Sequence, residues 1–144
     1  MRADESILER CLFFTSNRLA NVLRRIVNDV YAETGIAAPH VYLLIIVNQY
    51  PEITITELSN KLDIVPSTCT RFVNELVKQG ILIKNQEWKT VHVSLTELGR
   101  AKIEKIDNGL AKLRERLREF ISDEEYKNLA ALMWDAANKI ELKN

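Results

Sequence analysis

The sequence predicts a mainly α-helical domain with one small β-hairpin. Hydrophobic residues recur at helical steps of three, four and seven over most of the 144 residues. The period changes to strict alternation only between Ile81 and Leu95, as in a hairpin. Glycine and proline are scarce, at four and three residues, whereas β-sandwiches and other turn-rich folds need many of them.

The composition narrows the class of protein. A chain of 144 residues fits a single domain, 1–144, and 47% hydrophobic with 28% charged residues is ordinary for a globular protein. Twenty Lys and Arg balance twenty Asp and Glu, so the overall charge favours neither a nucleic acid nor a membrane as partner. No apolar run reaches about 18 residues and no export signal is visible, so we expect a cytoplasmic protein with no membrane partner. Two cysteines do not make a disulfide framework.

A long first helix is expected from Ser6 to Glu33, ended by Gly35. Its apolar positions are Leu8, Cys11, Leu12, Leu19, Val22, Leu23, Ile26 and Val30. A helix of nearly this whole span far exceeds the mean of about 11–12 residues in globular domains. The excess length indicates dimerisation.

Two further helices are predicted before the middle of the chain. The run from His40 to Tyr50 is rich enough in Val and Ile for a buried strand, but Pro39 in front and Pro51 behind favour a buried helix. A short helix then begins at Thr54, which forms a capping box with Glu57.

A tight turn over 63–65 leads to a helix from Ser67 to Gln79, opened by Pro66 and closed by Gly80. The apolar stripe of this helix consists of Cys69, Phe72, Val73, Leu76 and Val77. The opposite, polar face carries Ser67, Thr70, Arg71, Asn74 and Lys78.

The hairpin follows, with Ile81, Ile83, Val91, Val93 and Leu95 as its alternating apolar positions. A second long helix is capped by Thr96 and interrupted by Gly109, and Ser122 opens a last helix with a second capping box. The second long helix has the 3,4 spacing of a helix that packs on a partner helix, through Ile103, Ile106, Leu110, Leu113, Leu117 and Phe120. The last helix is expected to turn inward Tyr126, Leu129, Met133, Ala136 and Ile140.

This order of elements is that of a winged helix-turn-helix set between long N- and C-terminal dimerisation helices. In such a unit one face of the second helix packs on the core, and the other face is free to enter the roughly 12 Å wide major groove of DNA. The free face needs short polar side chains and an arginine that reaches a base. The candidate DNA-binding residues are Ser67, Thr68, Thr70, Arg71 and Asn74.

The chain resembles the MarR (multiple antibiotic resistance regulator) family. The resemblance rests on the runs 55–59, 65–76 and 80–82 and on Val93-Ser94-Leu95-Thr96-Glu97-Leu98-Gly99, and it spans essentially the whole chain. It implies a homodimeric transcription factor, usually a repressor, that binds a palindromic operator. It also implies that the first, fifth and last helices build the dimer and that a small ligand or thiol oxidation releases the DNA.

The hairpin departs from the family pattern. Family wings carry an Asp-x-Arg motif whose arginine enters the minor groove, and this hairpin has no arginine between Lys84 and Lys89. Lysine is a less specific minor-groove probe because it is a strongly hydrated point charge. We therefore expect only phosphate or groove contact from Lys84 and Lys89. Trp88, near the tip, either folds back on the domain or stacks in an interface.

Charge is the chief objection to DNA binding. Residues 54–100 hold six Lys and Arg against five Asp and Glu, a net charge of +1, which predicts modest and salt-sensitive affinity. The alternative function is a winged-helix protein-interaction module without DNA affinity. The side-chain types of the free face and the family resemblance favour DNA.

Three other groups of residues are candidates for a chemical role. Cys11 is a candidate redox sensor, since one branch of the family keeps a reactive cysteine in its first helix, but a packing role is favoured because the flanking positions do not match that branch. Phe13, Phe14, Tyr31 and Tyr42 line an effector pocket or belong to the core. His40 and His92 show no metal-ligand spacing, and His40 is expected to be structural or solvent-facing.

The sequence thus predicts a transcriptional regulator and not an enzyme, with no cofactor and no metal. Residues 1–36 and 101–144 are expected to form the dimerisation helices, and residues 37–100 the DNA-binding lobe. The expected partners are a double-stranded operator, a second copy of the chain and a small-molecule effector.

Overall fold

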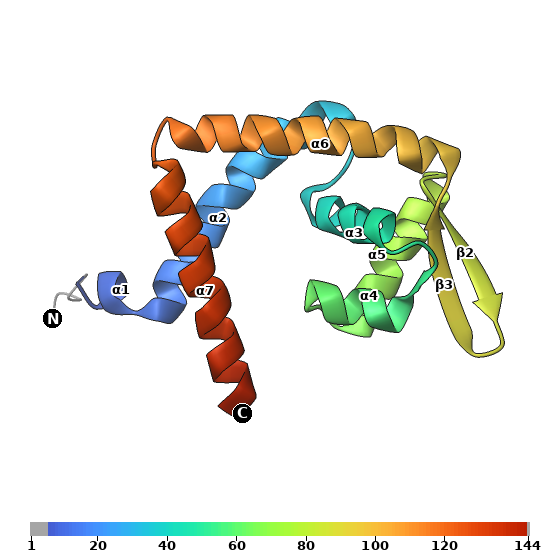
Figure 1. The fold of residues 1–144 in the computed structure, drawn as a ribbon, viewed down its shortest axis with the longest axis horizontal. Helices are drawn as coiled ribbons and strands as arrows, with labels where there is room; N and C mark the ends of the chain where they lie inside the picture. Colours follow the sequence, from blue (N-terminus) through green and yellow to red (C-terminus); the bar gives the residue numbers. More distant parts are fainter. Residues whose placement is uncertain (1–5, 144) are drawn as a thin grey trace, which may run out of the picture. The chain divides into compact units, whose positions relative to one another are not determined.

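The computed structural model describes residues 6–143 and contains helices and one small sheet (Figure 1). The chain divides into two compact units, 6–109 and 110–143, and the helix α6 contributes to both. The elements are α1 (Ser6–Arg10), α2 (Leu12–Tyr31), the 3-10 helix η1 (Ala32–Thr34), α3 (Ala38–Gln49), β1 (Ile53–Thr54), α4 (Ile55–Leu62), α5 (Pro66–Lys78), β2 (Leu82–Glu87), β3 (Thr90–Leu95), α6 (Glu97–Arg118) and α7 (Asp123–Lys143). The predicted mainly α-helical fold with a β-hairpin wing is confirmed.

The first helix is broken, so the prediction of one uninterrupted helix is wrong. Cys11 adopts an extended backbone (φ −88°, ψ 114°), and its carbonyl accepts the bond from the Thr15 amide that starts α2. The spacing of apolar residues indicates which face of a helix packs. It does not indicate that a single residue has non-helical φ and ψ angles. The predicted end is confirmed, because Gly35 takes the left-handed conformation with φ +72°.

The apolar run after Pro39 is a helix, as predicted, and it forms the centre of the first unit. Its side chains Val41, Leu43 and Leu44 are fully buried. They share the core with fully buried residues of α4, α5 and β3, which are Leu58, Val73, Leu76 and Val93. Close packing around α3 fixes the scaffold that carries α5.

The sheet has three antiparallel strands in the order β1-β3-β2. The sequence does not reveal β1, because a strand of two residues is too short to show alternation. The predicted face of β2 is also corrected. Ile83 is exposed and Leu82 is buried, because Ile81 still belongs to the turn after α5, where its amide bonds to the Leu76 carbonyl.

Tyr31 and Gly109 join α2 to α6 within the first unit. The Tyr31 hydroxyl donates to the Ile106 carbonyl (2.9 Å), and a Cβ on Gly109 would overlap the Tyr31 ring. Glycine weakens a helix by about 1 kcal/mol relative to alanine, and here it makes room for an aromatic ring. Tyr31 is 1% exposed, and desolvation raises its pKa to about 12.

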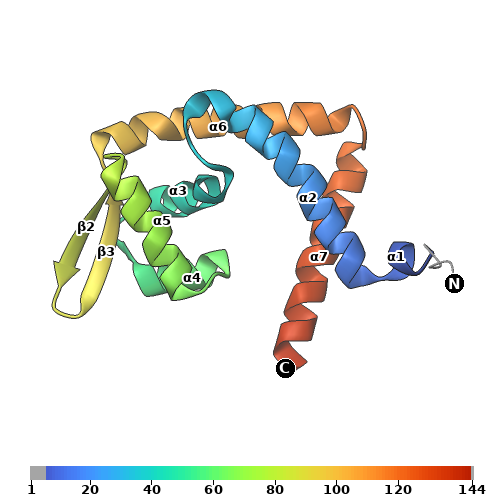
Figure 2. The same ribbon diagram turned by 180° about the vertical axis from the view of Figure 1, so that it is seen from behind.

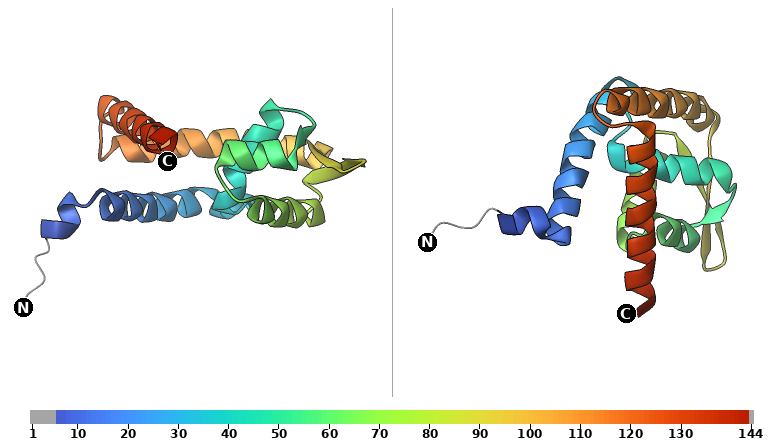
Figure 3. Two further views of the ribbon diagram at one scale, coloured as in Figure 1. Left: turned by 90° about the horizontal axis from the view of Figure 1, so that it is seen from below. Right: turned by 60° about the vertical axis from the view of Figure 1, so that its left-hand side comes forward.

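The second unit contains the end of α6 and α7, which is a single uninterrupted helix (Figure 3). The predicted capping box is present, with the Glu125 amide bonded to Ser122 Oγ (3.1 Å) and the Ser122 amide bonded to Glu125 Oε1 (3.3 Å). Arg118 Nε lies 2.9 Å from Asp123 Oδ1, which lowers the pKa of that carboxyl.

Several apolar side chains of α7 that were expected to point inward are exposed, so the expectation is wrong for those residues. Leu129, Met133 and Ile140 are exposed, as are Leu132 and Trp134. The heptad spacing marks an apolar face, but it does not state that the same copy of the chain covers that face.

Among residues 6–143 no single helix is long and apolar enough to cross a membrane. The pair Leu12–Thr34 and Ala38–Gln49 meets that requirement only when joined across a 72° bend.

Candidate nucleic-acid interface

Helices α4 and α5 and the turn between them form the helix-turn-helix of the first unit (Figure 2). Helix α4 begins at the predicted capping box, in which the Glu57 amide bonds to Thr54 Oγ1 (3.1 Å) and the Thr54 amide to Glu57 Oε2 (3.3 Å). Asp63 ends α4 in the left-handed conformation, with φ +54°. This residue redirects the chain so that α5 starts three residues later at an angle to α4.

One face of α5 is locked into the core. Cys69, Val73 and Leu76 are fully buried, and Cys69 Sγ lies 3.9 Å from the Ile55 carbonyl oxygen at the start of α4. Burial raises the pKa of the Cys69 thiol, so this group stays protonated and serves as packing. Because rotation of α5 would expose these apolar side chains to water, the helix is held with its opposite face toward the solvent.

The opposite face of α5 holds the predicted DNA-binding residues. Ser67, Thr70, Arg71 and Asn74 are exposed and follow one another at steps of three, one and three, which places them on a single stripe. Thr68 is half-buried and lies at the edge of this stripe. The chain's own body therefore leaves open the surface that the sequence assigned to the duplex.

The first turn of α5 presents backbone amides. Val65 at the N-cap is extended and supplies no side-chain cap, and Pro66 occupies the first turn. The amides of Ser67 and Thr68 follow, at the positive end of the helix dipole. A 13-residue helix with this open start has the geometry that favours phosphate.

A cluster that the sequence did not reveal supports the middle of α5. His40 of α3, which is 5% exposed, places Nε2 3.0 Å from Glu75 Oε2 and packs edge-on against the Phe72 ring at 5.1 Å. The Arg71 guanidinium lies over the same Phe72 ring at 5.2 Å. Of the two roles expected for His40, the structural one is correct. Spacing rules gave no signal for this pairing because the partners lie on separate helices.

The wing is attached to α5 through two of the predicted residues. Lys84 Nζ donates to Asn74 Oδ1 at 2.6 Å, so β2 and the exposed face of α5 lie side by side. Lys89 lies in the turn of the hairpin. Trp88, also in that turn, is 94% exposed and does not fold back on the chain.

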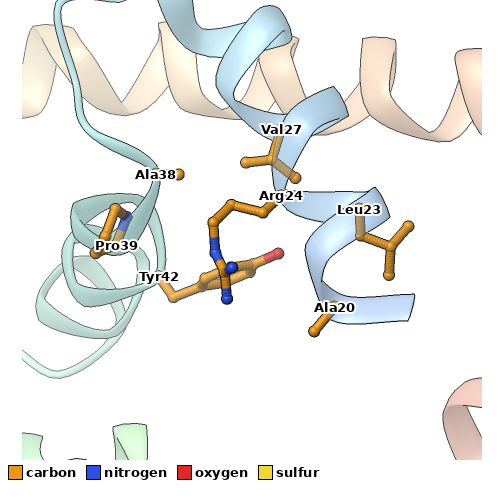
Figure 4. A pocket seen from close by; sticks show the side chains of 7 residues that line it. All are labelled: Ala20, Leu23, Arg24, Val27, Ala38, Pro39 and Tyr42. Carbon is orange, nitrogen blue, oxygen red and sulfur yellow. The ribbon is translucent and has the colours of Figure 1, made fainter. Parts of the chain in front are cut away.

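A cavity of about 350 Å³ lies between α2 and α3 (Figure 4). It is lined by Ala20, Leu23, Arg24 and Val27 from α2 and by Ala38, Pro39 and Tyr42 from α3. Figure 4 shows the Arg24 guanidinium and the Tyr42 ring extending from the two helices into this space.

Of the four aromatic residues proposed for an effector pocket, Tyr42 alone lines this cavity. Tyr31 is buried against α6, and Phe13 and Phe14 lie on the exposed surface of α2. These four residues were predicted from their aromatic side chains alone. The cavity wall also includes small apolar side chains such as Ala20 and Val27, which the helical spacing does not distinguish from core residues.

Within the described residues, the two cysteines and His92 form no cluster suited to catalysis or metal binding. Cys11 is half-buried at the start of α2 and Cys69 is buried, and both thiols are free. Within residues 6–143, no group of His, Cys, Asp and Glu side chains is arranged to hold a metal ion. His92 Nδ1 lies 2.8 Å from the Glu52 carbonyl oxygen, which ties the loop before β1 to β3.

Comparison with protein families and relatives agrees with this geometry. Residues 43–83 match a family described as winged helix-turn-helix DNA-binding. An HTH-type transcriptional regulator of Bacillus cereus is 27% identical over 117 residues, which is 81% of this chain and 80% of that protein. A shorter match, 44% identical over 57 residues, is to riboflavin kinase of Pyrococcus abyssi and covers 27% of that enzyme.

Three solved structures of transcriptional regulators share this fold. The transcriptional repressor CouR bound to a 23-mer DNA duplex has a TM-score of 0.86 at 16% identity, over 95% of this chain and 99% of that one. CouR of Rhodococcus jostii RHA1 bound to p-coumaroyl-CoA has a TM-score of 0.79 at 18% identity, over 90% and 94%. The oxidised form of MarR from E. coli has a TM-score of 0.73 at 22% identity, over 88% and 94%.

These matches run over most of the chain, and they coincide with an α5 whose polar face is open. The curated relative with the broad match is a transcriptional regulator, whereas the enzyme match spans only 38% of this chain. The chain is a winged helix-turn-helix transcriptional regulator with the fold of the MarR family.

Proposed function

We propose that the chain is a homodimeric, sequence-specific DNA-binding repressor whose α5 reads a pseudo-palindromic operator in the cytoplasm. One observation carries the proposal: the polar stripe of α5 is exposed while its opposite face is fully buried. A helix that is held in this way presents a constant set of side chains to the major groove.

The exposed residues divide by reach and chemistry. Arg71, near the middle of the stripe, has the planar donor fork that suits a guanine edge, and Asn74 one turn later suits an adenine edge. The hydroxyls of Ser67, Thr68 and Thr70 are short enough for phosphate contacts at the start of the helix. Lys84 and Lys89 supply charge from the wing.

Lys84 and Asn74 act together in this proposal. With Asn74 Oδ1 held by Lys84 Nζ at 2.6 Å, the orientation of the amide is set before DNA arrives. The ammonium retains two further N–H groups for a phosphate oxygen. A side chain that is already oriented loses less entropy on binding.

Dimerisation would bring two copies of α5 to one duplex. Residues 1–36 and 101–144 are the proposed dimerisation segments, and 37–100 is the DNA-binding lobe. Support comes from large apolar side chains that stay exposed in the single chain, including Leu12, Phe13, Leu132 and Trp134. Half-sites about 34–36 Å apart would match two recognition helices in successive major grooves.

A small-molecule effector is proposed for the cavity between α2 and α3. Its wall is mostly apolar, with Arg24 as a cation and Tyr42 as an aromatic surface, so it suits an aromatic anion. CouR, which has the same fold, is described as bound to p-coumaroyl-CoA. Because α3 also carries His40, which contacts Glu75 of α5, a displaced α3 would alter the support of the recognition helix.

A protein-interaction module without DNA affinity is the second candidate, and the low net charge of +1 over residues 54–100 favours it. Three of the five acidic groups in that segment have intramolecular partners, which reduces their freedom to face a phosphate. Glu57 bonds to the Thr54 amide, and Glu75 and Glu87 lie 3.0 and 4.0 Å from histidine nitrogens. The two candidates differ in how binding responds to salt.

Fluorescence anisotropy with a duplex from the chain's own upstream region tests the proposal. Arg71→Ala is expected to weaken specific binding by about 5- to 150-fold, since a bidentate base contact is worth roughly 1–3 kcal/mol. Arg100→Ala is the matched control, because it removes one exposed arginine at the start of α6, outside both the stripe and the proposed dimerisation segments. Wild-type binding that is absent at both 50 and 200 mM salt would reject the DNA-binding function in favour of the second candidate.

A further inference from the structure

The tip of the wing carries the most exposed large apolar side chain of residues 6–143. Glu87 and Thr90 form the last pair of the hairpin, so Trp88 and Lys89 make up its two-residue turn. Trp88 is 94% exposed. Because an indole presents one of the largest apolar surfaces of any side chain, full exposure at this site is unfavourable for the isolated chain.

The backbone at Trp88 is equally unfavourable. Its φ is +60°, in the left-handed region, where two-residue hairpin turns favour Gly, Asn or Asp. Gln86 Nε2 donates to the Trp88 carbonyl at 3.3 Å and braces this conformation. Bulky residues persist at left-handed positions mainly where binding uses them. The exposure of the Trp88 indole and the left-handed backbone at Trp88 are thus both typical of a residue that contacts a binding partner.

The strand length brings this tip to the DNA-facing end of the first unit. Helix α5 has 13 residues, or about 20 Å, and β2 has six residues, also about 20 Å. The chain turns back at Gly80, so β2 runs opposite to α5, and Figures 1 and 2 show the tip at the same end as the start of α5. The bond from Lys84 to Asn74 holds the two elements together along this path.

We propose that Trp88 binds DNA by inserting its indole into the minor groove beside the major groove that α5 occupies. This inference rests on the proposed function. Major and minor grooves alternate about 17 Å apart along a duplex whose turn is about 34 Å, so a hairpin alongside α5 meets the flanking minor groove. Apolar wedges in the minor groove partly unstack a base step and read how easily the step deforms.

The surroundings of Trp88 favour a nucleic acid over a protein. Its neighbours are Glu87 and Lys89, and the strand behind it presents Lys84, Asn85 and Gln86, all exposed. The Glu87 carboxylate lies 4.0 Å from His92 Nε2, and the two lysines leave residues 84–90 with a net charge of +1. A protein-docking surface has a contiguous apolar patch around its anchor. Within residues 84–90 the indole is the single large apolar group, and the polar side chains around it suit phosphates and sugars.

Tryptophan fluorescence tests the contact directly. The chain has two tryptophans, so Trp134→Phe leaves Trp88 as the sole reporter. Addition of the operator duplex is expected to quench Trp88 emission and to protect the indole from acrylamide. Trp88→Phe, which keeps Trp134, should show neither change and also serves if Trp134→Phe weakens the dimer. Trp88 protection that grows with protein concentration in the absence of DNA would overturn the proposal in favour of a protein contact.

The melting temperature and the operator affinity of one variant, Trp88→Gly, distinguish a DNA contact from a structural role. Trp88→Gly removes the indole and relieves the left-handed backbone, so the melting temperature should hold or rise. Operator affinity should nevertheless fall by about tenfold or more, the range expected for one aromatic group stacked on a base. A change in affinity below twofold overturns the proposal.

The recognition-helix variant Arg71→Ala separates the proposed DNA-binding function from the proposed role of Trp88. If the wild type binds and Arg71→Ala does not, while Trp88→Gly binds normally, the DNA-binding function stands and the role of Trp88 fails. If the wild type binds no DNA, both fail. Selection of operator sequences with the wild type and with Trp88→Gly should also differ, with a preference for deformable flanking steps present in the wild type alone.

Discussion

His40 Nε2 lies 3.0 Å from Glu75 Oε2, and this contact joins the helix that borders the cavity to the helix that presents the DNA-binding stripe. The imidazole is nearly fully buried, whereas the Glu75 side chain is about half exposed. Phe72 completes the contact by packing edge-on against the imidazole. The orientation of α5 thus depends on one polar bond between two helices as well as on its apolar face.

Replacing His40 tests how much this bond contributes to stability. His40→Leu removes the bond and the edge-on ring contact, while Glu75 remains accessible to water, so the free energy of unfolding should fall by about 1–2 kcal/mol. Urea unfolding monitored by circular dichroism measures it. Glu75→Gln, which keeps a hydrogen-bonding oxygen at that position, should lose less. Equal losses in the two variants would show that ring packing does not matter.

Tyr31 predicts a loss of stability at alkaline pH. Burial raises its pKa from 10.0 to about 12, so folding favours the protonated phenol. The stabilisation is fully present below pH 10 and is lost as pH rises toward 12, by up to about 2–3 kcal/mol.

Unfolding free energies between pH 8 and 11.5 check this expectation. Tyr31→Phe should flatten the alkaline decline and, at pH 8, reduce stability by about 1 kcal/mol through loss of the bond to the Ile106 carbonyl. Tyr50→Phe, which alters an exposed phenol, is the control. An alkaline decline of the same size in Tyr31→Phe would assign the effect to other groups.

The two cysteines are expected to differ in reactivity. Cys69 is buried with a raised pKa, and Cys11 is half-buried at the start of α2. A thiol reagent at pH 7.5 should therefore label Cys11 first, and Cys11→Ser should abolish that label. We expect peroxide to leave operator binding the same in the wild type and in Cys11→Ser, because a packing role is favoured for Cys11. Release of DNA from the wild type alone would establish an oxidation switch.

The cavity predicts binding of an aromatic carboxylate. Benzoate titrated by calorimetry should bind the wild type, and Arg24→Ala should weaken that binding by about tenfold or more, since a charge-assisted hydrogen bond is worth roughly 1.5–3 kcal/mol. Arg25→Ala is the matched control, because Arg25 is the next residue on α2 and does not line the cavity. Comparable weakening in both variants would point to a non-specific effect of charge.

The sequence by itself determined the elements that local chemistry specifies. The capping boxes at Thr54 and Ser122, the prolines in the first turns of α3 and α5 and the apolar stripe of α5 each depend on residues within a few positions of one another. Residue order is therefore enough to predict them. The exposed stripe of Ser67, Thr70, Arg71 and Asn74 follows directly, because the position of the buried face sets the position of the other.

Only the tertiary structure decided the contacts between residues that are distant in sequence. The pairing of His40 with Glu75, the fit of Tyr31 against Gly109, the bond from Lys84 to Asn74 and the strand β1 all depend on how separate elements meet in space. A periodic pattern states which face of a helix is apolar, and it carries no information about the partner. The same limit explains Cys11, since one residue that leaves the helical region does not disturb the pattern on either side.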